Sequence, residues 1–504
     1  MTASLVTFAV GLGIRFGLTP YIVQTLGPEA YGFIGLSANI LSYTGLITIA
    51  LNSMAGRFIT VSYCAKKIDE ANKYYSSVFF SNIILAMVIA IIACGCIIWL
   101  DKFINIPCEL INDVKWLFIF LTINNLIGLL SGTWAVATFV KNRLDLSNIQ
   151  AIIGNIINAL FLAILFSFFK PHVWYIGIAG LFQTLYTAST NYIFMGKLTP
   201  DLILRRTYFE LIKIKELLKS GLWNLISKLG DILGHGLDLL IANLCIGSVE
   251  MGIFAITKNV PFLILSLFQS ISAVFAPTMT RFFAENKREK LLNECYKSIR
   301  ILSFFTAIPL SCLYVYGDCF YKLWLPSEDS YNLLYLTILG TFALPYTLPL
   351  ESLWNIFTIT NKLKYSTIFM VANNVVVFVI VMTSMIVVES HEIRLWILAG
   401  TRSICGVIRG FIFLPMYGGH CLNSPKMIFY KIIIKSLAYI SISLLCCFTL
   451  KIFFTPQTWT GLIVAFILVG FICSILGIIF VLKKTDRDFL VNKIRKLAHG
   501  KHFK

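Results

Sequence analysis

Charged residues are scarce in this chain, and acidic residues are the scarcest. Only 13% of its 504 residues are Asp, Glu, Lys or Arg, and only 24 residues of the whole chain are acidic. Hydrophobic residues make up 58% of the sequence, and its mean hydropathy is +0.82. No soluble core could bury so much apolar surface, so the composition excludes a soluble globular protein and indicates a membrane protein.

Motifs of enzymatic chemistry are also missing from the sequence. It contains no glycine-rich phosphate loop, no histidine cluster with metal-ligand spacing and no nucleophile elbow. Its 13 cysteines show no paired metal spacing, and pairs such as Cys446 and Cys447 lie inside apolar runs, which is typical of structural thiols. These absences predict a protein that is not an enzyme and that holds neither a metal nor an organic cofactor.

Long apolar runs occur along the whole chain. Fourteen of them cover roughly residues 1–23, 32–55, 77–100, 115–140, 148–169, 173–195, 221–245, 253–279, 300–316, 331–358, 366–388, 395–417, 431–450 and 460–482. Most are long enough for a helix to cross a hydrocarbon core of about 30 Å, whereas barrel strands would alternate over about ten residues. We therefore predict an all-α polytopic membrane protein with about 14 transmembrane helices.

Lysine and arginine are unevenly distributed between alternate loops. If the N-terminus is cytoplasmic, 31 of the 42 basic residues lie in cytoplasmic loops or in the tail Lys483–Lys504, and six lie outside. The positive-inside rule therefore predicts that both termini are cytoplasmic. Because the net charge of +18 is spread over many short loops, it does not indicate binding to nucleic acid. The longest outer loops, 101–114 and 317–330, have no room for the external domain of a glycan polymerase or ligase.

The sequence contains an internal duplication with an offset of 219 to 220 residues. The heptapeptide Leu26–Gly32 (LGPEAYG) corresponds to Ile246–Gly252 (IGSVEMG), and each copy lies between two long apolar runs. Pro107 likewise corresponds to Pro326, and Asn142 matches the residue 219 positions later. Each repeat holds six predicted helices, an even number, so the repeats are parallel and related by an axis along the membrane normal.

The duplication divides the chain into four parts. A first lobe covers 1–195, a linker 196–220, a second lobe 221–420, and two extra helices with a basic tail 421–504. The linker contains the helix-start signal Thr199–Asp201, followed by apolar and basic residues. Two interpretations of it remain open, an interfacial amphipathic helix and a solvated basic loop.

Charged residues inside predicted helices mark the candidate site, because each costs on the order of 2.5 to 3.5 kcal/mol at bilayer depth. The basic residues are Arg15, Lys228, Lys258, Arg402 and Arg409, and the acidic residues are Asp231, Asp238 and Glu351. Such residues usually face a cavity or a partner. For Arg409 we expect instead that the side chain snorkels to the cytoplasmic surface.

The predicted helix 221–245 carries a polar stripe. Its members follow spacings of 4, 3, 4 and 3 and are Asn224, Lys228, Asp231, His235 and Asp238. At about 100° per residue they fall within an arc of about 80°. The stripe favours a cavity lining, and the alternative is helix packing, with Lys228 paired to Asp231 and His235 to Asp238.

Amide side chains lie on polar faces of the fifth and sixth predicted helices. Asn155 belongs to the fifth and Gln183 to the sixth. Amides suit sugar hydroxyls, but inside membranes they also form hydrogen bonds with neighbouring helices, and the sequence favours neither role.

Two segments resemble a known family. Leu26–Phe33 (LGPEAYGF) and Asn52–Phe58 (NSMAGRF) are similar to the polysaccharide-transporter branch of the multidrug/oligosaccharidyl-lipid/polysaccharide (MOP) exporter superfamily. Within that branch the chain resembles Wzx-type flippases of O-antigen, capsule or exopolysaccharide units over nearly its whole length. The resemblance implies two MATE-like lobes around a V-shaped cavity. It also implies a flippase that moves an undecaprenyl-diphosphate-linked oligosaccharide across the bacterial cytoplasmic membrane by alternating access.

This resemblance implies roles for the candidate residues. A basic cavity suits a diphosphate, so Arg15, Lys228 and Lys258 would attract the substrate. The other candidates for the substrate cavity are Asn224, Asn155 and Gln183. Charge tuning, or coupling to H⁺ or Na⁺, would fall to Asp231, His235 and Asp238, and His235 has an unperturbed pKa of about 6.5, close to working pH.

The implied partners are the lipid-linked oligosaccharide and membrane lipids, together with a polysaccharide polymerase and glycosyltransferases. Two other transporters of the same fold are the alternatives. One is a cation-coupled multidrug exporter, for which we would expect an acidic rather than a basic cavity. The other is a flippase of lipid II or teichoic acid.

Overall fold

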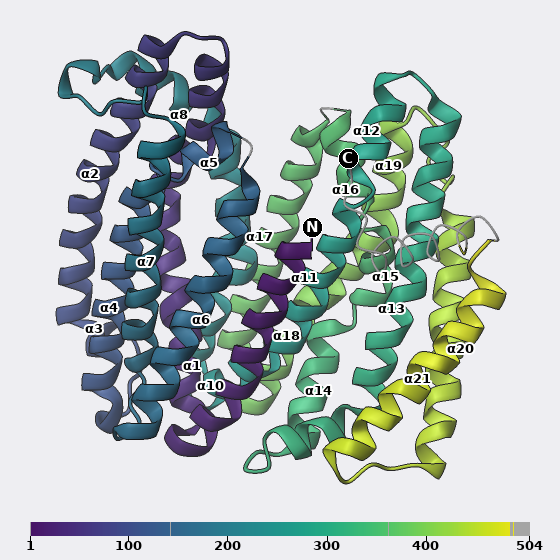
Figure 1. Cartoon of the computed structure of the whole chain (residues 1–504). Coiled ribbons are helices and arrows are strands. Elements are labelled where there is room, and N and C mark those ends of the chain that lie inside the picture. Colours follow the sequence, from purple (N-terminus) through teal and green to yellow (C-terminus); the bar gives the residue numbers. More distant parts are fainter. Residues whose placement is uncertain (1, 142, 361, 484–486, 488–504) are drawn as a thin grey trace. The chain divides into compact units, whose positions relative to one another are not determined.

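Helices form all the regular structure in the computed structural model of this chain, which describes residues 2–141, 143–360, 362–483 and 487 (Figure 1). The chain forms two compact units. Unit 1 consists of the residues up to Ile256 together with Met370–Val379, and unit 2 consists of Thr257–Phe369 together with the residues from Ile380 onward. The all-α architecture expected from the apolar runs is confirmed.

Unit 1 is built from long helices that lie alongside one another (Figure 1). Its helices are α1 (Thr2–Cys64), α2 (Ile68–Ile98), α3 (Leu100–Phe103), α4 (Ile111–Ser131), α5 (Val136–Val140), α6 (Leu144–Phe168), α7 (Tyr175–Leu198), α8 (Leu211–Asp231), α9 (Asp238–Cys245) and α10 (Ser248–Thr257). Shorter turns are the 3₁₀ turns η1 (Cys108–Leu110) and η2 (Arg206–Tyr208) and the π-helical turn η3 (Ile232–Gly236). Helix α1 packs against α2, α6 and α8, and α4 packs against α7.

Unit 2 is organised around one long helix, α13. Its helices are α11 (Asn259–Ala273), α12 (Ala276–Ala284), α13 (Arg288–Trp324), α14 (Ser330–Thr341), α15 (Leu344–Thr347), α16 (Leu353–Ile359), the two ends of α17 (Leu363–Val387), α18 (His391–Ile408), α19 (Leu414–Cys421), α20 (Tyr430–Phe453) and α21 (Trp459–Phe480). The middle of α17, Met370–Val379, belongs to unit 1. Shorter turns are the 3₁₀ turn η4 (Leu348–Leu350) and the π-helical turn η5 (Arg409–Phe413). Helices α14, α20 and α21 all pack against α13, which explains why so many of its side chains are buried.

The first two predicted membrane crossings form one helix with a sharp kink. Gly27 has φ 86° and ψ 164°, a backbone conformation that glycine adopts far more readily than other residues. Pro28 follows, and it has no backbone N–H to continue the helical hydrogen bonds. The kink takes the place of the loop expected between residues 23 and 32.

Eleven helices among the described residues are long and apolar enough to cross a membrane. One of them, Phe16–Cys64, is the part of α1 that contains the kink, the end of the first predicted crossing and the whole of the second. Helix α7 and the α8–α9 segment correspond to two further predicted crossings but are not among the eleven. For α8 the reason is its charged first half, which includes Lys213, Lys215 and Lys219.

Side chains of α2 tether the segment between α7 and α8. Asn72 accepts a hydrogen bond from the backbone N–H of Ile203 at 2.9 Å and donates one to the carbonyl of Asp201 at 3.2 Å. These bonds use backbone groups that a helix would need, so no helix begins at Thr199–Asp201. Within the predicted linker, α7 ends at Leu198 and α8 begins at Leu211. Apart from η2, the residues between them, 199–210, are non-helical.

A charged network joins the start of α8 to α2. Lys213 Nζ lies 3.2 Å from Glu70 Oε1 and 3.3 Å from the Tyr74 hydroxyl, which itself donates to Glu216. Burial alone would lower the pKa of Lys213, but its hydrogen bonds to Tyr74 and Glu70 outweigh burial and raise that pKa above its ordinary value. The lysine therefore remains charged and ties α8 to α2.

Equivalent positions of the two sequence repeats meet inside unit 1. Gly32 and Gly252, the last residues of the repeated heptapeptides, lie so close that a Cβ on Gly32 would be 2.8 Å from the Gly252 Cα. A Cβ on Gly252 would collide with the carbonyl oxygen of Pro28. Small residues allow helix backbones to approach closely inside membranes. The repeated glycines are therefore explained by direct packing of one repeat on the other.

This contact predicts opposite effects for two Gly→Ala substitutions. Gly252→Ala should destabilise the protein by about 1 to 3 kcal/mol, because its methyl group meets rigid backbone rather than a movable side chain. Gly56→Ala is the matched control, because a Cβ there meets no atom within 4 Å, and it should stabilise by about 0.5 to 1 kcal/mol through helix propensity. Thermal unfolding of the purified proteins measures both effects. A Gly252→Ala protein as stable as the control would rule out the glycine contact.

Candidate functional site

The predicted polar stripe begins on the face of α8 that packs against α1. Asn224 Nδ2 donates a hydrogen bond to Ser53 Oγ at 3.0 Å. Lys228 is half-buried, and a Cβ on Gly45 of α1 would lie 3.8 Å from its Cε. Asn224 is therefore engaged in helix packing, while Lys228 places an ammonium group beside a glycine of α1.

A π-helical turn divides the stripe into two parts, which corrects its expected geometry. The arc of about 80° assumed a regular α-helix, but η3 replaces it at Ile232–Gly236. A π turn holds one extra residue, and one residue corresponds to about 100° around a helix. His235 and Asp238 are accordingly rotated away from Asn224, Lys228 and Asp231. The side chain of His235 is exposed, whereas Asp238 is only 6% exposed.

Hydrogen bonds from neighbouring side chains explain the π turn. Asn374 of α17 donates to the carbonyl of Gly230 at 2.9 Å, and Tyr43 donates to the carbonyl of Gly236 at 2.8 Å. A Cβ on Gly234 would lie 2.6 Å from Asn374 Cγ, so only glycine leaves room for this approach. Side chains that insert into the helical hydrogen-bond ladder are a known cause of such bends.

The pairing of Lys228 with Asp231 that the alternative interpretation requires is weak. Lys228 acts electrostatically on Asp231. Among the described residues, however, no ion pair within 4.0 Å joins the two side chains. Lys228 is therefore not neutralised by direct contact with its own helix.

The two amide candidates bind each other. Gln183 Nε2 of α7 donates to Asn155 Oδ1 of α6 at 3.1 Å. One turn away, Gln150 of α6 donates to the backbone carbonyl of Thr187 at 2.9 Å and to Asn191 Oδ1 at 3.0 Å. Of the two roles left open by the sequence, the contacts favour helix pairing over sugar binding.

The remaining predicted cations are divided between the units. Arg15 lies in α1, and its side chain is outside the described part of the chain. Lys258 belongs to unit 2, where it immediately precedes α11 and is half-buried. Lys228 belongs to unit 1, so the shared cavity expected for these three cations stays a prediction.

Arg409 is half-buried, and the expectation that its side chain snorkels to the cytoplasmic surface stays a prediction. Its Nε is buried and has no hydrogen-bond partner within the described part of the chain. Glu351, in the same unit, acts on it electrostatically. Arg409 is the first residue of η5, and its Nε is enclosed by the protein although the residue as a whole is only half-buried.

Sequence reasoning missed one polar cluster in unit 1. Asn52 and Asn82 exchange reciprocal amide hydrogen bonds at 3.0 Å, and Asn82 also donates to Thr133 Oγ1 at 3.3 Å. Asn52 and Thr133 line a cavity of about 210 Å³. The sequence does contain a signal for this cluster, because Asn82 is a polar residue inside an apolar run. No group of three His, Cys, Asp or Glu among the described residues could hold a metal ion.

The fold defines the class of protein. It is similar to an inward-facing multidrug resistance MATE family transporter of the MOP superfamily, with a TM-score of 0.65 at 15% identity over 83% of this chain and 95% of that one. It is also similar to the lipid II flippase MurJ in an inward closed conformation, with a TM-score of 0.64 at 15% identity over 94% of this chain and 97% of that one. The chain is an all-α polytopic membrane protein with a fold like those of this MATE transporter and MurJ.

The family follows from the sequence comparison. A family model described as "Polysaccharide biosynthesis protein" matches residues 23–327, more than half of the chain, so the chain belongs to this family. It is also 27% identical to the "Uncharacterized membrane protein EpsK" of Bacillus subtilis (strain 168). The alignment extends over 498 residues and covers 98% of this chain and 97% of the relative. The resemblance carried by Leu26–Phe33 and Asn52–Phe58 is confirmed.

The Asn155–Gln183 pair predicts a coupled effect on stability. Gln183→Leu and Asn155→Leu should each destabilise the protein, because each leaves the other amide without its partner. The double variant should lose less than the sum, by a coupling of about 0.6 to 1.7 kcal/mol. Thermal unfolding of the two single variants and the double variant completes the cycle. Additive losses would contradict the pairing.

Proposed function

We propose that this protein is a flippase that moves an undecaprenyl-diphosphate-linked oligosaccharide from the inner to the outer leaflet of the bacterial cytoplasmic membrane. Its membership of the polysaccharide biosynthesis protein family carries the proposal. Likeness in fold to a protein named as a lipid II flippase, over 94% of the chain, supports it. The family links the chain to polysaccharide biosynthesis, and the flippase-like fold supports transport of a lipid-linked precursor as its part in that process.

The proposed architecture has fourteen crossings. To the eleven apolar helices it adds a second crossing within α1, α7, and the α8–α9 segment. Two six-helix repeats then precede α20 and α21, which have no counterpart in the duplication. Both termini are cytoplasmic, because 31 of the 42 basic residues then lie on that side.

The proposed mechanism rests on fixed cations that replace part of the hydration of the diphosphate. A diphosphate carries charge that the bilayer core cannot solvate, and lysine and arginine form strong charge-assisted hydrogen bonds with phosphate oxygens. Among the cations whose side chains the structure describes, Lys228 is the strongest candidate for contact with the diphosphate, because it is half-buried and not ion-paired to Asp231. Arg15 and Lys258 are assigned the same role. Since Asn155 and Gln183 bind each other, neither is assigned to the sugar.

Ion coupling is assigned to the second half of the divided stripe. His235 is exposed on η3, and its unperturbed pKa of about 6.5 suits a group that takes up and releases a proton near working pH. Asp231 and Asp238 tune the local charge. The coupling ion in this scheme is H⁺, with Na⁺ as the alternative.

A cation-coupled multidrug exporter is the second candidate, and the MATE likeness with a TM-score of 0.65 favours it. The balance of intramembrane charge opposes it. An exporter of cationic drugs needs acids that attract its substrates, whereas five basic residues and three acidic ones lie within the predicted helices.

Deletion of the gene tests the substrate class. The deletion strain should lose surface polysaccharide and accumulate lipid-linked oligosaccharide on the cytoplasmic leaflet, because assembly continues while translocation stops. Surface glycan and lipid-linked precursors are quantified in parallel, and the wild-type gene should restore both. Normal surface glycan together with new sensitivity to cationic drugs would support the exporter instead.

Complementation of the same strain tests Lys228. Lys228→Ala should fail to restore surface polysaccharide at normal membrane abundance, because it removes a cation that the diphosphate requires. Lys215→Ala is the matched control, since it removes an exposed lysine from the same helix, and it should complement fully. Full complementation by Lys228→Ala, or failure accompanied by degradation, would remove Lys228 from the mechanism.

Single cysteines in a cysteine-free background test the orientation. On intact cells a membrane-impermeant maleimide should label Ser327→Cys, in the proposed outer loop, and should label Lys197→Cys only after permeabilisation. Because these positions are expected on opposite sides, labelling of both from the same side would refute the proposed topology.

A further inference from the structure

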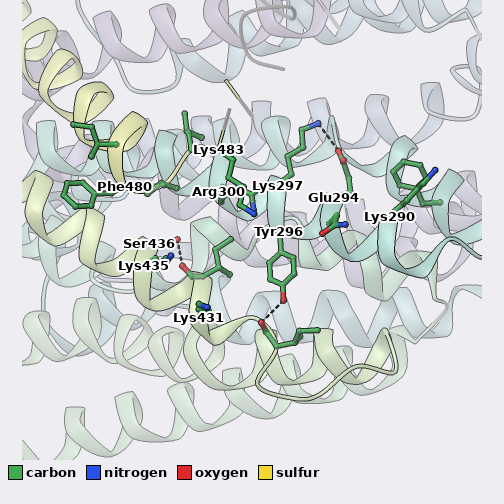
Figure 2. Close-up of a pocket in the computed structure, with 17 residues that line it drawn as sticks. Lys290, Glu294, Tyr296, Lys297, Arg300, Lys431, Lys435, Ser436, Phe480 and Lys483 are labelled. Atoms are coloured by element: carbon green, nitrogen blue, oxygen red, sulfur yellow. Dashed lines mark hydrogen bonds and ion pairs between the residues drawn. The ribbon is translucent and has the colours of Figure 1, made fainter. Parts of the chain in front are cut away.

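Unit 2 contains a basic pocket that the proposed transport mechanism does not use (Figure 2). It has a volume of about 1020 Å³ and is built by the first half of α13, the start of α20 and the end of α21. All of its lining residues belong to unit 2.

The walls of this pocket are tied together by hydrogen bonds. The Tyr296 hydroxyl of α13 donates to the carbonyl of Ile428, just before α20, at 3.0 Å. Ser303 of α13 and Ser436 of α20 form a hydrogen bond at 2.6 Å, and both are fully buried or nearly so. These bonds hold α13 and α20 at a defined separation, so the pocket is formed before any ligand binds.

Positive charge from three helices converges on the pocket. Its basic residues are Lys290, Lys297 and Arg300 on α13, Lys431 and Lys435 on α20, and Lys483 just after α21. A single carboxylate lines the pocket with them, that of Glu294, and it lies 3.6 Å from Lys297 Nζ. Figure 2 shows Lys297 and Glu294 pointing toward each other, with Arg300 and Lys431 also at the pocket. The described lining therefore carries a large excess of positive charge.

The pocket lies at the boundary between apolar helix and basic flank. Lys431 is the second residue of α20, and Lys483 follows α21 by three residues, so both mark the ends of apolar helices long enough to cross a membrane. Ile432, Phe480 and Leu482 add apolar lining next to these cations. Positive charge beside apolar surface at the end of a membrane-spanning helix matches the phosphate and the first methylene groups of a membrane lipid.

We propose that this pocket binds the phosphate headgroup of an anionic phospholipid, one of the bulk lipids of the membrane rather than the transported substrate. Basic pockets between transmembrane helices are suited to such headgroups. The apolar lining favours a lipid over a soluble phosphate, because a free ion would leave that surface in water. The site is independent of the flippase proposal, since Lys228 and the rest of the divided stripe belong to other helices.

Binding of phosphatidylglycerol to the purified full-length protein in an uncharged detergent tests the proposal. Native mass spectrometry should show saturable binding, with zwitterionic phosphatidylcholine bound at least about tenfold more weakly. The double variant Lys431→Gln/Lys435→Gln should weaken phosphatidylglycerol binding by at least about tenfold, because each lysine near a headgroup contributes about fivefold. Both lysines are exposed and at the start of a helix, so their loss should leave the fold intact.

The matched control is Lys215→Gln/Lys219→Gln, which removes two exposed lysines at the same spacing near the start of α8. It should change phosphatidylglycerol binding less than twofold. If the Lys431/Lys435 variant unfolds at a lower temperature than wild type, Lys290→Gln on the opposite wall replaces it and should weaken binding by about fivefold.

Three results would overturn the proposal. Equal binding of the two phospholipids would remove the role of negative charge. Displacement of phosphatidylglycerol by millimolar inorganic phosphate would identify a soluble-anion site. Binding of a polyprenyl diphosphate but not of phosphatidylglycerol would instead assign the pocket to the substrate.

Discussion

The backbone contact between Gly32 and Gly252 is the constraint on which unit 1 depends. Lipid tails are as apolar as leucine, so helices inside a bilayer associate through close packing and hydrogen bonds rather than through the hydrophobic effect. The two glycines supply the close packing between the repeats. Reciprocal hydrogen bonds between Asn105 and Asn243, at 2.8 to 2.9 Å, add a second tie between the α3–α4 connection and α9.

The two π turns, η3 and η5, change the direction in which the following side chains point compared with a regular α-helix. In η3, Tyr43 donates to the carbonyl of Gly236, and in η5, Tyr430 donates to the carbonyl of Phe411 at 2.8 Å. Each turn thus has a tyrosine hydroxyl bound to a backbone carbonyl inside it. Because backbone groups inside a membrane must be satisfied within the protein, these tyrosines make the irregular turns tolerable.

Most intramembrane amides serve packing, which narrows the candidate site. Asn155 with Gln183, and Asn52 with Asn82, bind each other across helix interfaces. Lys228 differs because it is half-buried without a close counter-ion among the described residues. Sequence spacing alone could not separate these cases, because an amide in an apolar helix carries the same signal whether it faces a cavity or another amide.

Composition and the positions of the apolar runs determined the class of protein, because a chain that is 58% hydrophobic is soluble only in a membrane and only helices suit such runs. The motif at Leu26–Phe33 determined the family. Tertiary structure decided which residues share a face: η3 rotated His235 and Asp238 away from Lys228, and side chains of α2 kept residues 199–205 out of a helix. It also gathered Lys290, Lys431 and Lys483 into one pocket. These arrangements depend on hydrogen bonds between residues far apart in the chain, and no local sequence pattern predicts such bonds.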